Sequence, residues 1–309
     1  MANRHEMVGT ESVNMAWSKG LAEWDDGETT YISVAFTWRL QDAYMRAVFA
    51  KAHGQSVRVG GPAVFLPKLS AMFDDVAEVG GDYPGAIARH NPDATMASRG
   101  CPVGCWFCIV PAMEGKSFTL DHDFPVRPVL CDNNLSALPD DFQNHIIRRY
   151  KDANVVLTDA NSGFEPTTFT TNVYNRWRPL LNAGKGPWRF AYDETKEGKD
   201  VRRVMQMLTA EPQKRKRVYV LIGNEPFEDC MARIQEVIDH GCEPHVQPFI
   251  KLNALERKPH ARHDWNVQLL KDVARWANGW VWKKAPFSDY CRSRRRAPEQ
   301  YDGQQGLFV

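Results

Sequence analysis

Apolar positions near the N-terminal end of the chain follow first a strand pattern and then a helix pattern. Residues 31–36 read YISVAF, an apolar run of the length expected of a buried strand. Residues 39–53 then place apolar side chains at helical spacing, and a second apolar strand over residues 56–59 ends in Gly60-Gly61-Pro62. This strand–helix–strand unit predicts a small α/β layer within residues 1–94.

Beyond residue 94, short apolar strands alternate with amphipathic helical stretches. The candidate strands lie at residues 95–98, 129–131, 154–158, 188–192, 217–222 and 245–250. The candidate helices lie near residues 140–150, 167–182, 198–209 and 227–240. Repeated alternation of this kind predicts an α/β fold with a parallel sheet and right-handed crossovers over residues 95–252.

Residues 253–309 form a third part, with a helical pattern near residues 265–278 and a high density of tryptophan. Its apolar positions lie along one side, as expected of a helix packed on a larger body. We expect this C-terminal extension to cover the open side of the preceding α/β part and to shape access to it.

Composition is typical of a water-soluble enzyme. Of the 309 residues, 43% are hydrophobic and 25% charged, enough for a sizeable core, and no apolar stretch reaches the length of a membrane span. The first residues lack a hydrophobic signal region, which indicates the cytoplasm, or the host cytoplasm for a phage protein. Net charge is only +1, yet basic runs at residues 214–217 and 292–296 are candidates for contact with a polyanion such as DNA, or are solvated surface.

Three of the seven cysteines lie within eight residues: Cys101, Cys105 and Cys108, spaced C-x3-C-x2-C. Three thiolates on one loop can hold three corners of an iron–sulfur cube and leave the fourth iron without a nearby protein ligand. An iron with an open position can bind a substrate or cofactor and pass it an electron.

Other ligand sets remain open. His122 could complete a Cys3His zinc site, although a second C-x2-C pair is absent from the sequence. Cys131 could supply a fourth thiolate to a ferredoxin-type cluster. Disulfides are disfavoured, because the number of cysteines is odd and four of them are scattered singly.

The segment from Ser98 to Cys108 resembles the signature of the radical S-adenosylmethionine (SAM) superfamily. The resemblance implies a 4Fe–4S cluster on Cys101, Cys105 and Cys108, with SAM on the open iron and an external electron donor. It also implies reductive cleavage of SAM to a 5′-deoxyadenosyl radical, and a partial (β/α)6 TIM-like barrel. Phe107 resembles the residue whose backbone meets adenine.

Under this resemblance, residues at the ends of the predicted strands are candidate SAM contacts, because the active sites of such barrels are built from the loops that follow the strands. They are Asp132, Asn133, Asn134, Asp159, Asn161, Asp193, Ile222 and Gln247. Local structure is the alternative for some: an Asx turn at 132–134, or a helix cap at Asp193 or Glu194. Cys131 is a candidate hydrogen-atom donor or a buried core cysteine.

The N-terminal layer resembles that of cobalamin-dependent radical SAM proteins but lacks the D-x-H-x-x-G ligand motif, so we expect no cobalamin and disfavour a cobalamin-type methyltransferase. The compact chain resembles a phage and bacterial group in which some members isomerise an amino-acid adduct during thymidine hypermodification. A nucleoside or DNA substrate is therefore expected. The alternatives are a radical SAM enzyme on a free small metabolite and a non-enzymatic iron–sulfur or zinc protein.

Overall fold

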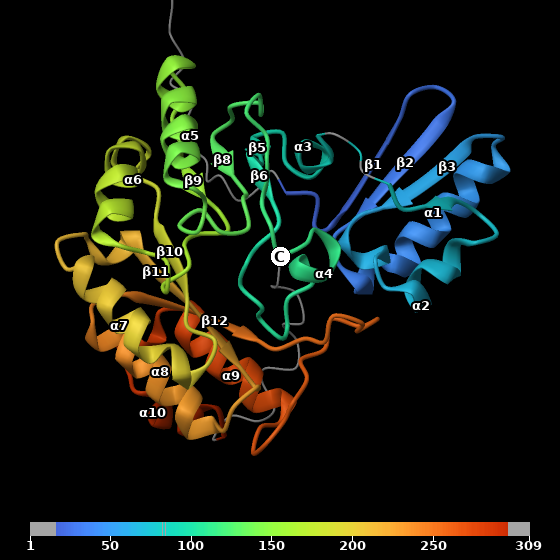
Figure 1. The fold of residues 1–309 in the computed structure, drawn as a ribbon. Coiled ribbons are helices and arrows are strands. Elements are labelled where there is room, and N and C mark those ends of the chain that lie inside the picture. Colours follow the sequence, from blue (N-terminus) through green and yellow to red (C-terminus); the bar gives the residue numbers. More distant parts are fainter. Residues whose placement is uncertain (1–16, 82, 84, 296–309) are drawn as a thin grey trace, which may run out of the picture.

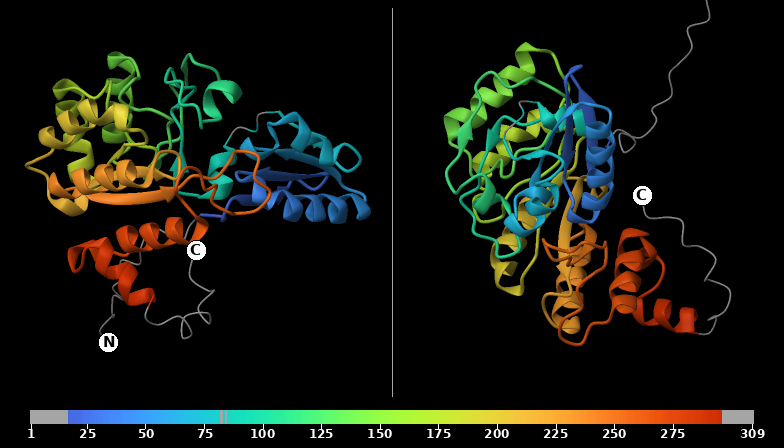
Figure 2. Two further views of the ribbon diagram at one scale, coloured as in Figure 1. Left: turned by 90° about the horizontal axis from the view of Figure 1, so that it is seen from below. Right: turned by 90° about the vertical axis from the view of Figure 1, so that its right-hand side faces the viewer.

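The computed structural model describes residues 17–81, 83 and 85–295, and within them the chain forms a mixed α/β fold (Figure 1). Strands form a four-stranded sheet near the N-terminal end, two three-stranded sheets and a two-stranded hairpin. The α/β class expected from the alternating pattern is confirmed. Figure 2 shows the N-terminal sheet, in blue, beside the rest of the chain.

The N-terminal sheet has the order β1-β2-β3-β4. Its strands and the helix that connects β2 to β3 are β1 (Leu21–Asp25), β2 (Thr29–Val34), α1 (Leu40–Ala52), β3 (Ser56–Gly60) and β4 (Glu78–Val79). Strands β2, β3 and β4 are parallel, so the predicted strand–helix–strand unit is confirmed. Gly61 follows β3 with φ +96°, and a Cβ atom there would lie 2.6 Å from the carbonyl oxygen of Val34, which only glycine avoids.

Strand β1 was not expected from the sequence. It pairs antiparallel with β2 through a short turn, in which Asp26 Oδ1 accepts hydrogen bonds from the backbone N–H groups of Glu28 and Thr29 (3.1 and 2.9 Å). A carboxylate that bonds the backbone two and three residues later stabilises such turns. The Asp-Asp-Gly sequence before β2 is therefore the sequence signal of this hairpin, and it lies outside the apolar runs.

Two parallel three-stranded sheets make up the middle of the chain. The first has the order β5-β8-β9, with β5 (Ala94–Thr95), β8 (Val129–Leu130) and β9 (Asp159–Ala160). The second has the order β10-β11-β12, with β10 (Trp188–Ala191), β11 (Lys216–Ile222) and β12 (Glu243–Pro248). The backbone N–H of Phe164, after β9, bonds the carbonyl of Arg189 in β10 (2.9 Å), so the two sheets meet at this point.

Helices connect these strands and bury their apolar faces against them. The helices beyond α1 are α2 (Pro67–Ser70), α3 (Ala86–His90), α4 (Val110–Met113), α5 (Asp140–Asp152), α6 (Thr171–Gly184), α7 (Gly198–Met207), α8 (Phe227–Asp239), α9 (Val267–Asn278) and α10 (Phe287–Arg295). The five longest of these match the predicted helical stretches. One apolar core lies on α5 and α6, and a second lies between β10–β12 and helices α8 and α9.

The predicted strand at residues 154–158 is wrong. The strand at this place is β9 and begins at Asp159. Asn154 adopts a left-handed conformation (φ +52°) after α5, and Val156 is half exposed, so the apolar run Asn154-Val-Val-Leu-Thr is a connection to the sheet. The predicted strand at 95–98 is also divided, into β5 and β6 (Ser98–Arg99).

The C-terminal part packs α9 on the second sheet, where Leu270, Val273 and Ala277 join its core. The Trp276 indole N–H bonds the carbonyl of Ala285 (2.9 Å) and holds the turn that leads to α10. Within residues 17–81, 83 and 85–295, no helix combines the length and the apolar character that crossing a membrane requires.

Candidate functional site

The three clustered cysteines lie on one loop that a two-stranded hairpin closes at its base. Strand β6 pairs antiparallel with β7 (Thr119–Leu120), and residues 100–118 between them are here called the cysteine loop. Gly100 opens the loop with φ +89°, and a Cβ atom there would lie 2.3 Å from the carbonyl oxygen of Ser117. The backbone N–H of Cys101 bonds the carbonyl of Gly115 (3.2 Å). The two ends of the loop are thus held together next to the first cysteine.

Glu114 fastens the loop from inside. Its carboxylate accepts hydrogen bonds from the backbone N–H of Gly100 (2.9 Å) and the side-chain amide of Asn133 (2.7 Å), and pairs with Arg99 (2.9 Å). Its side chain is only 10% exposed, so these partners replace water. Sequence reasoning did not identify Glu114, because no local pattern shows that its carboxylate returns to the start of the loop.

The three sulfurs are half-buried and influence one another. Burial raises the pKa of the Cys105 thiol to about 12, and the neighbouring Cys108 adds to the shift. Burial also raises the pKa of Cys108, to which the charge of Cys101 contributes. The raised pKa values favour the protonated thiols of Cys105 and Cys108, and a bound metal centre would supply the positive charge that thiolates require.

The fit of a metal to this loop depends on the kind of metal centre. Across the described part of the chain, no three Cys, His, Asp or Glu side chains come together as ligands of a single ion. The His122 ring packs against Phe142 and His145 (centroids 5.1 and 5.0 Å), so the Cys3His zinc set does not form here. Three cysteines on a short loop are a donor set that iron–sulfur clusters use. Cys108 influences the pKa of Cys105, and Cys101 influences that of Cys108, so the three donors of this set lie near one another.

Asn134 contacts the first cysteine directly. Its side-chain amide lies 3.8 Å from Cys101 Sγ in a donor geometry, and its own oxygen accepts from Ser136 Oγ and the Ala137 N–H (both 3.2 Å). Hydrogen bonds to sulfur are one of the means by which proteins set cluster potentials. The structure thus places Asn134 beside the sulfurs, and its neighbour Asn133 against Glu114.

Asp132 holds the residues that lead into the cysteine loop. It is fully buried, and its two oxygens accept from the backbone N–H of Ala97 (2.9 Å) and the hydroxyl of Ser98 (2.5 Å). Burial raises the pKa of Asp132 to about 6, and these hydrogen bonds oppose the shift. With both oxygens occupied inside the protein, this placement does not support the SAM contact expected for Asp132.

Cys131, directly before Asp132, is buried, and burial raises the pKa of its thiol to about 12, with the charges of Asp132 and Asp159 adding to the shift. Asn161 lies beside the thiol and hydrogen-bonds to it. Asp159 is engaged by Arg189, which donates to both of its oxygens (2.7 and 2.6 Å). Of the two third-strand candidates, Asp159 is held in an ion pair with Arg189, whereas the Asn161 side chain lies beside the Cys131 thiol.

Acidic side chains from the segments that follow β9 and β10 lie near Cys105. The negative charges of Glu165, Asp193 and Glu197 all contribute to the raised pKa of the Cys105 thiol. Burial raises the pKa of Asp193 to about 7, Glu197 adds to the shift, and Arg233 opposes it. An acidic surface beside a half-buried sulfur loop favours a cationic ligand such as an ammonium or sulfonium group.

Asp193 and Glu194 have different roles where β10 ends. Glu194 forms a capping box with Glu197, which accepts from the backbone N–H groups of Asp193 (2.7 Å) and Glu194 (3.1 Å). The cap of the helix at 195–197 is thus Glu194. Asp193 remains at the strand end beside Cys105, where the candidate site requires it. Sequence reasoning did not single out Glu197 or Glu165.

The fifth and sixth strands place their candidates differently. Ile222 shares the fully buried face of β11 with Val218 and Val220, which packs against α8 and α9. This placement does not support the adenine contact expected for Ile222. Gln247 is exposed on β12. Phe249 follows β12, and its ring lies 5.1 Å from that of Trp106, which in turn contacts Phe107 (5.3 Å), so the sixth strand meets the cysteine loop through aromatic rings.

The first basic run is largely engaged within the protein. Lys216 is buried, Arg215 pairs with Glu211 (3.1 Å), and Arg217 lies 3.7 Å from Glu243. The run ends in the first two residues of β11, Lys216 and Arg217, at the N-terminal end of the strand. In the second run, the side chains of residues 292–296 lie outside the described residues.

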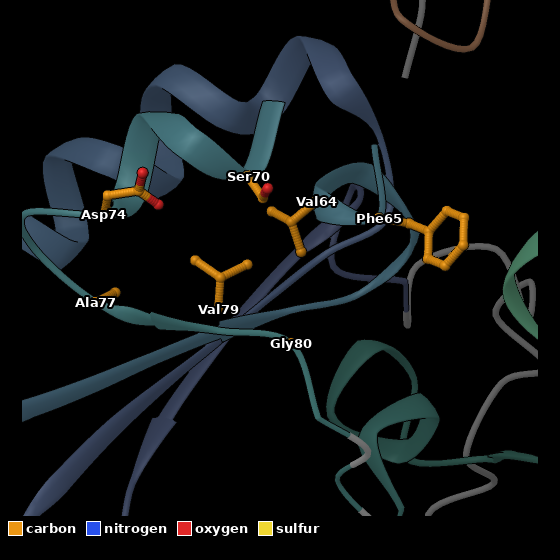
Figure 3. Close-up of a pocket in the computed structure, with 7 residues that line it drawn as sticks. All are labelled: Val64, Phe65, Ser70, Asp74, Ala77, Val79 and Gly80. Carbon is orange, nitrogen blue, oxygen red and sulfur yellow. The ribbon is translucent and has the colours of Figure 1, made fainter. Parts of the chain in front are cut away.

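A separate pocket of about 580 Å³ lies in the N-terminal layer (Figure 3). Figure 3 shows Ser70 and Asp74 on its helical wall and Val79 on the strand below. Its lining residues are Val64, Phe65, Ser70, Asp74, Ala77, Val79 and Gly80. None of them belongs to the cysteine loop, so this pocket is distinct from the candidate site.

No protein-family model matches the chain, and no curated protein matches it at a significant level.

Proposed function

We propose that the chain is a radical SAM enzyme whose cysteine loop holds a 4Fe–4S cluster on Cys101, Cys105 and Cys108. The observation that carries the proposal is the position of this loop, which follows the first strand of a parallel array and faces acidic residues at the end of the fourth. Ligands of parallel α/β sheets bind at the carboxyl ends of the strands.

The strand arrangement supports a partial (β/α)6 barrel. Six strands, β5, β8, β9, β10, β11 and β12, are parallel within their sheets and follow the chain in order. The Phe164–Arg189 backbone bond and the Asp159–Arg189 ion pair join the third strand to the fourth. An open array of six is what the resemblance to the superfamily implies, with residues 95–252 as its core.

Each group of the site has a proposed task. When bound, the cluster supplies the electron for cleavage of SAM to methionine and a 5′-deoxyadenosyl radical that abstracts hydrogen from the substrate. Glu114 and Asp132 hold the loop, Asn134 donates to the first sulfur, and Asp193 with Glu197 attracts the positive charge of SAM. The buried ring of Phe249 excludes water on one side.

The substrate that we propose is a nucleoside or a DNA base, in a hypermodification step that isomerises an amino-acid adduct of thymidine. It is supported by the resemblance of the compact chain and by a cation-rich loop beside the site, described below. A free small metabolite is the alternative substrate class.

Anaerobic reconstitution with iron and sulfide tests the proposal. The protein is reduced with dithionite in the presence of SAM, and 5′-deoxyadenosine and iron per chain are measured. We expect Cys101→Ala, Cys105→Ala and Cys108→Ala to abolish 5′-deoxyadenosine formation. Cys242→Ala is the matched control, because this cysteine is buried in the core of the second sheet, and Cys131→Ala is also expected to retain SAM cleavage. Turnover by the Cys105→Ala protein, or zinc in place of iron, would overturn the assignment.

A further inference from the structure

A loop rich in cations follows the sixth strand and borders the cysteine loop. Residues 251–263, here called the basic loop, contain four cations and a single carboxylate, Glu256, whereas the whole chain has a net charge of only +1. The four cations, Lys251, Arg257, Lys258 and Arg262, are all exposed. Within the described residues none of these four side chains forms an ion pair or a hydrogen bond. Their charge is therefore available to a ligand.

Hydrogen bonds and ring contacts hold the basic loop in place. The backbone N–H of His260 bonds the carbonyl of Phe249 (2.7 Å), so the loop returns to the strand end from which it started. Its middle is held by the Thr37 hydroxyl, which donates to the carbonyl of Ala254 and ties it to the N-terminal layer. A pocket of about 490 Å³ lies within it, lined by Lys251, Ala254, Leu255, Glu256, Lys258, Pro259 and His260.

The basic loop is continuous with the candidate site. The ring of Phe249 lies between those of Trp106 on the cysteine loop (5.1 Å) and His260 on the basic loop (6.0 Å). Burial and the charges of Lys251 and Arg262 together lower the pKa of His260, in agreement with cations that converge on this pocket. The site thus has an acidic part at Asp193 and Glu197 and a cationic rim at the basic loop. A cationic ligand and an anionic ligand would therefore bind at different places.

We infer that the basic loop binds the phosphate backbone of a single-stranded segment of DNA and presents a base to the cysteine loop. This inference rests on the proposed function and names the substrate class of the same site. Four cations spread along twelve residues match a chain of phosphates better than one phosphate group. Trp106 is 48% exposed and Leu255 61% exposed beside these cations, as expected where bases stack or pack next to a phosphate-binding surface. A base must also leave its stack before an enzyme can react with it.

The test measures binding of a thymine-containing single-stranded oligonucleotide by fluorescence anisotropy from 50 to 300 mM NaCl, with the reconstituted full chain. The charge-neutral variant carries Lys251→Gln, Arg257→Gln, Lys258→Gln and Arg262→Gln. Each phosphate contact contributes about 0.7 to the slope of log affinity against log salt for single strands, so four lost contacts reduce the slope by about 3. We expect affinity at 150 mM NaCl to fall at least tenfold.

A matched variant removes four exposed cations outside the basic loop, on α5, directly after α6 and shortly before β11. It carries Arg148→Gln, Lys151→Gln, Lys185→Gln and Lys214→Gln, and we expect it to bind within twofold of the unsubstituted protein. Equal loss in both variants, unchanged binding in the basic-loop variant, or binding of a thymidine mononucleotide that matches the oligonucleotide in affinity would overturn the inference. Thermal unfolding confirms that both variants fold. Failure of the proposed function shows separately, as absence of 5′-deoxyadenosine from the unsubstituted, reconstituted protein incubated with SAM and dithionite without an oligonucleotide.

Discussion

Arg189 donates two hydrogen bonds to the carboxylate of Asp159, from Nε at 2.7 Å and from Nη2 at 2.6 Å. Asp159 begins β9 in one three-stranded sheet, and Arg189 lies in β10 of the other. The pair therefore joins the two sheets beneath the candidate site. The two side chains are 12% and 17% exposed, so neither charge can return to water if its partner is lost.

Removal of one partner should destabilise the fold. We expect Arg189→Met and Asp159→Asn each to lower the free energy of unfolding by about 3 kcal/mol, since a buried charge is left unpaired, and the double variant to lose less than the sum. Urea denaturation measures these differences. The control is Arg58→Met, whose pair with Glu78 is exposed (55% and 68%) and contributes less than about 1 kcal/mol. An equal loss in Arg189→Met and Arg58→Met contradicts the joining role.

The start of the cysteine loop should tolerate no side chain. Gly100→Ala forces a left-handed backbone and places a Cβ atom 2.3 Å from the Ser117 oxygen, whereas a Cβ at Gly104, between the first two cysteines, meets nothing within 4 Å. We expect Gly100→Ala to lower stability by about 1–3 kcal/mol and to reduce iron per chain after reconstitution, and Gly104→Ala to match the unsubstituted protein. Iron analysis and thermal unfolding decide. Full iron loading of Gly100→Ala shows that the loop closes in another way.

Glu114 should control loading of the loop more than overall stability. In the unsubstituted protein Oε2 of Glu114 accepts from Gly100 and Asn133, and Oε1 accepts from Arg99. Glu114→Gln keeps one acceptor oxygen, so its N–H2 group must face either Arg99 or the other two donors, and at least one of these contacts is lost. We expect iron per chain to fall at least twofold. Asp123→Asn is the control, because this carboxylate is fully exposed after the same hairpin. Identical loading of the two variants excludes a fastening role for Glu114.

The long elements of the second sheet were predictable because their signals are redundant. Strands β10, β11 and β12 are four to seven residues long, buried on at least one face, and separated by helices of clear amphipathic period. Strands β5, β8 and β9 have two residues each, so their positions depend on the strands they pair with and not on local strand propensity. For this reason the strand expected at 154–158 lies instead at Asp159–Ala160.

Side-chain orientation limited prediction of the site. The cysteine spacing and Asp193 at a strand end are local features of the sequence. From the sequence, Ile222 is expected to contact adenine. Ile222 nevertheless lies two residues after Val220 and four after Val218, so all three share one face of the strand, and an apolar face of this kind indicates the core. Glu114 and Glu197 act through contacts to backbone N–H groups that depend on the loop path, which no local spacing encodes.

Asp193 gives the site a pH dependence near neutrality. Burial, reinforced by Glu197, raises the pKa of Asp193 to about 7, so the folded protein holds a proton there that the unfolded chain releases near pH 4. The free energy of unfolding contributed by this group therefore falls as pH rises from about 4 to 7 and is constant outside that window. A bound cation favours the ionised carboxylate, so affinity for SAM should rise with pH through 7 and level off above 8.

Asp193→Asn distinguishes the effect of this carboxylate from that of the neighbouring charges on Glu165, Glu197 and Arg233. We expect the variant to bind SAM at least tenfold more weakly at pH 8 and with the same affinity at pH 6 and 8, while the unsubstituted protein binds more tightly at pH 8. Calorimetric titration at both values measures this. Asp200→Asn on α7 is the control, since its carboxylate pairs with Arg203 on the helix surface. A pH dependence that persists in Asp193→Asn assigns the titration to another group and removes Asp193 from the SAM site.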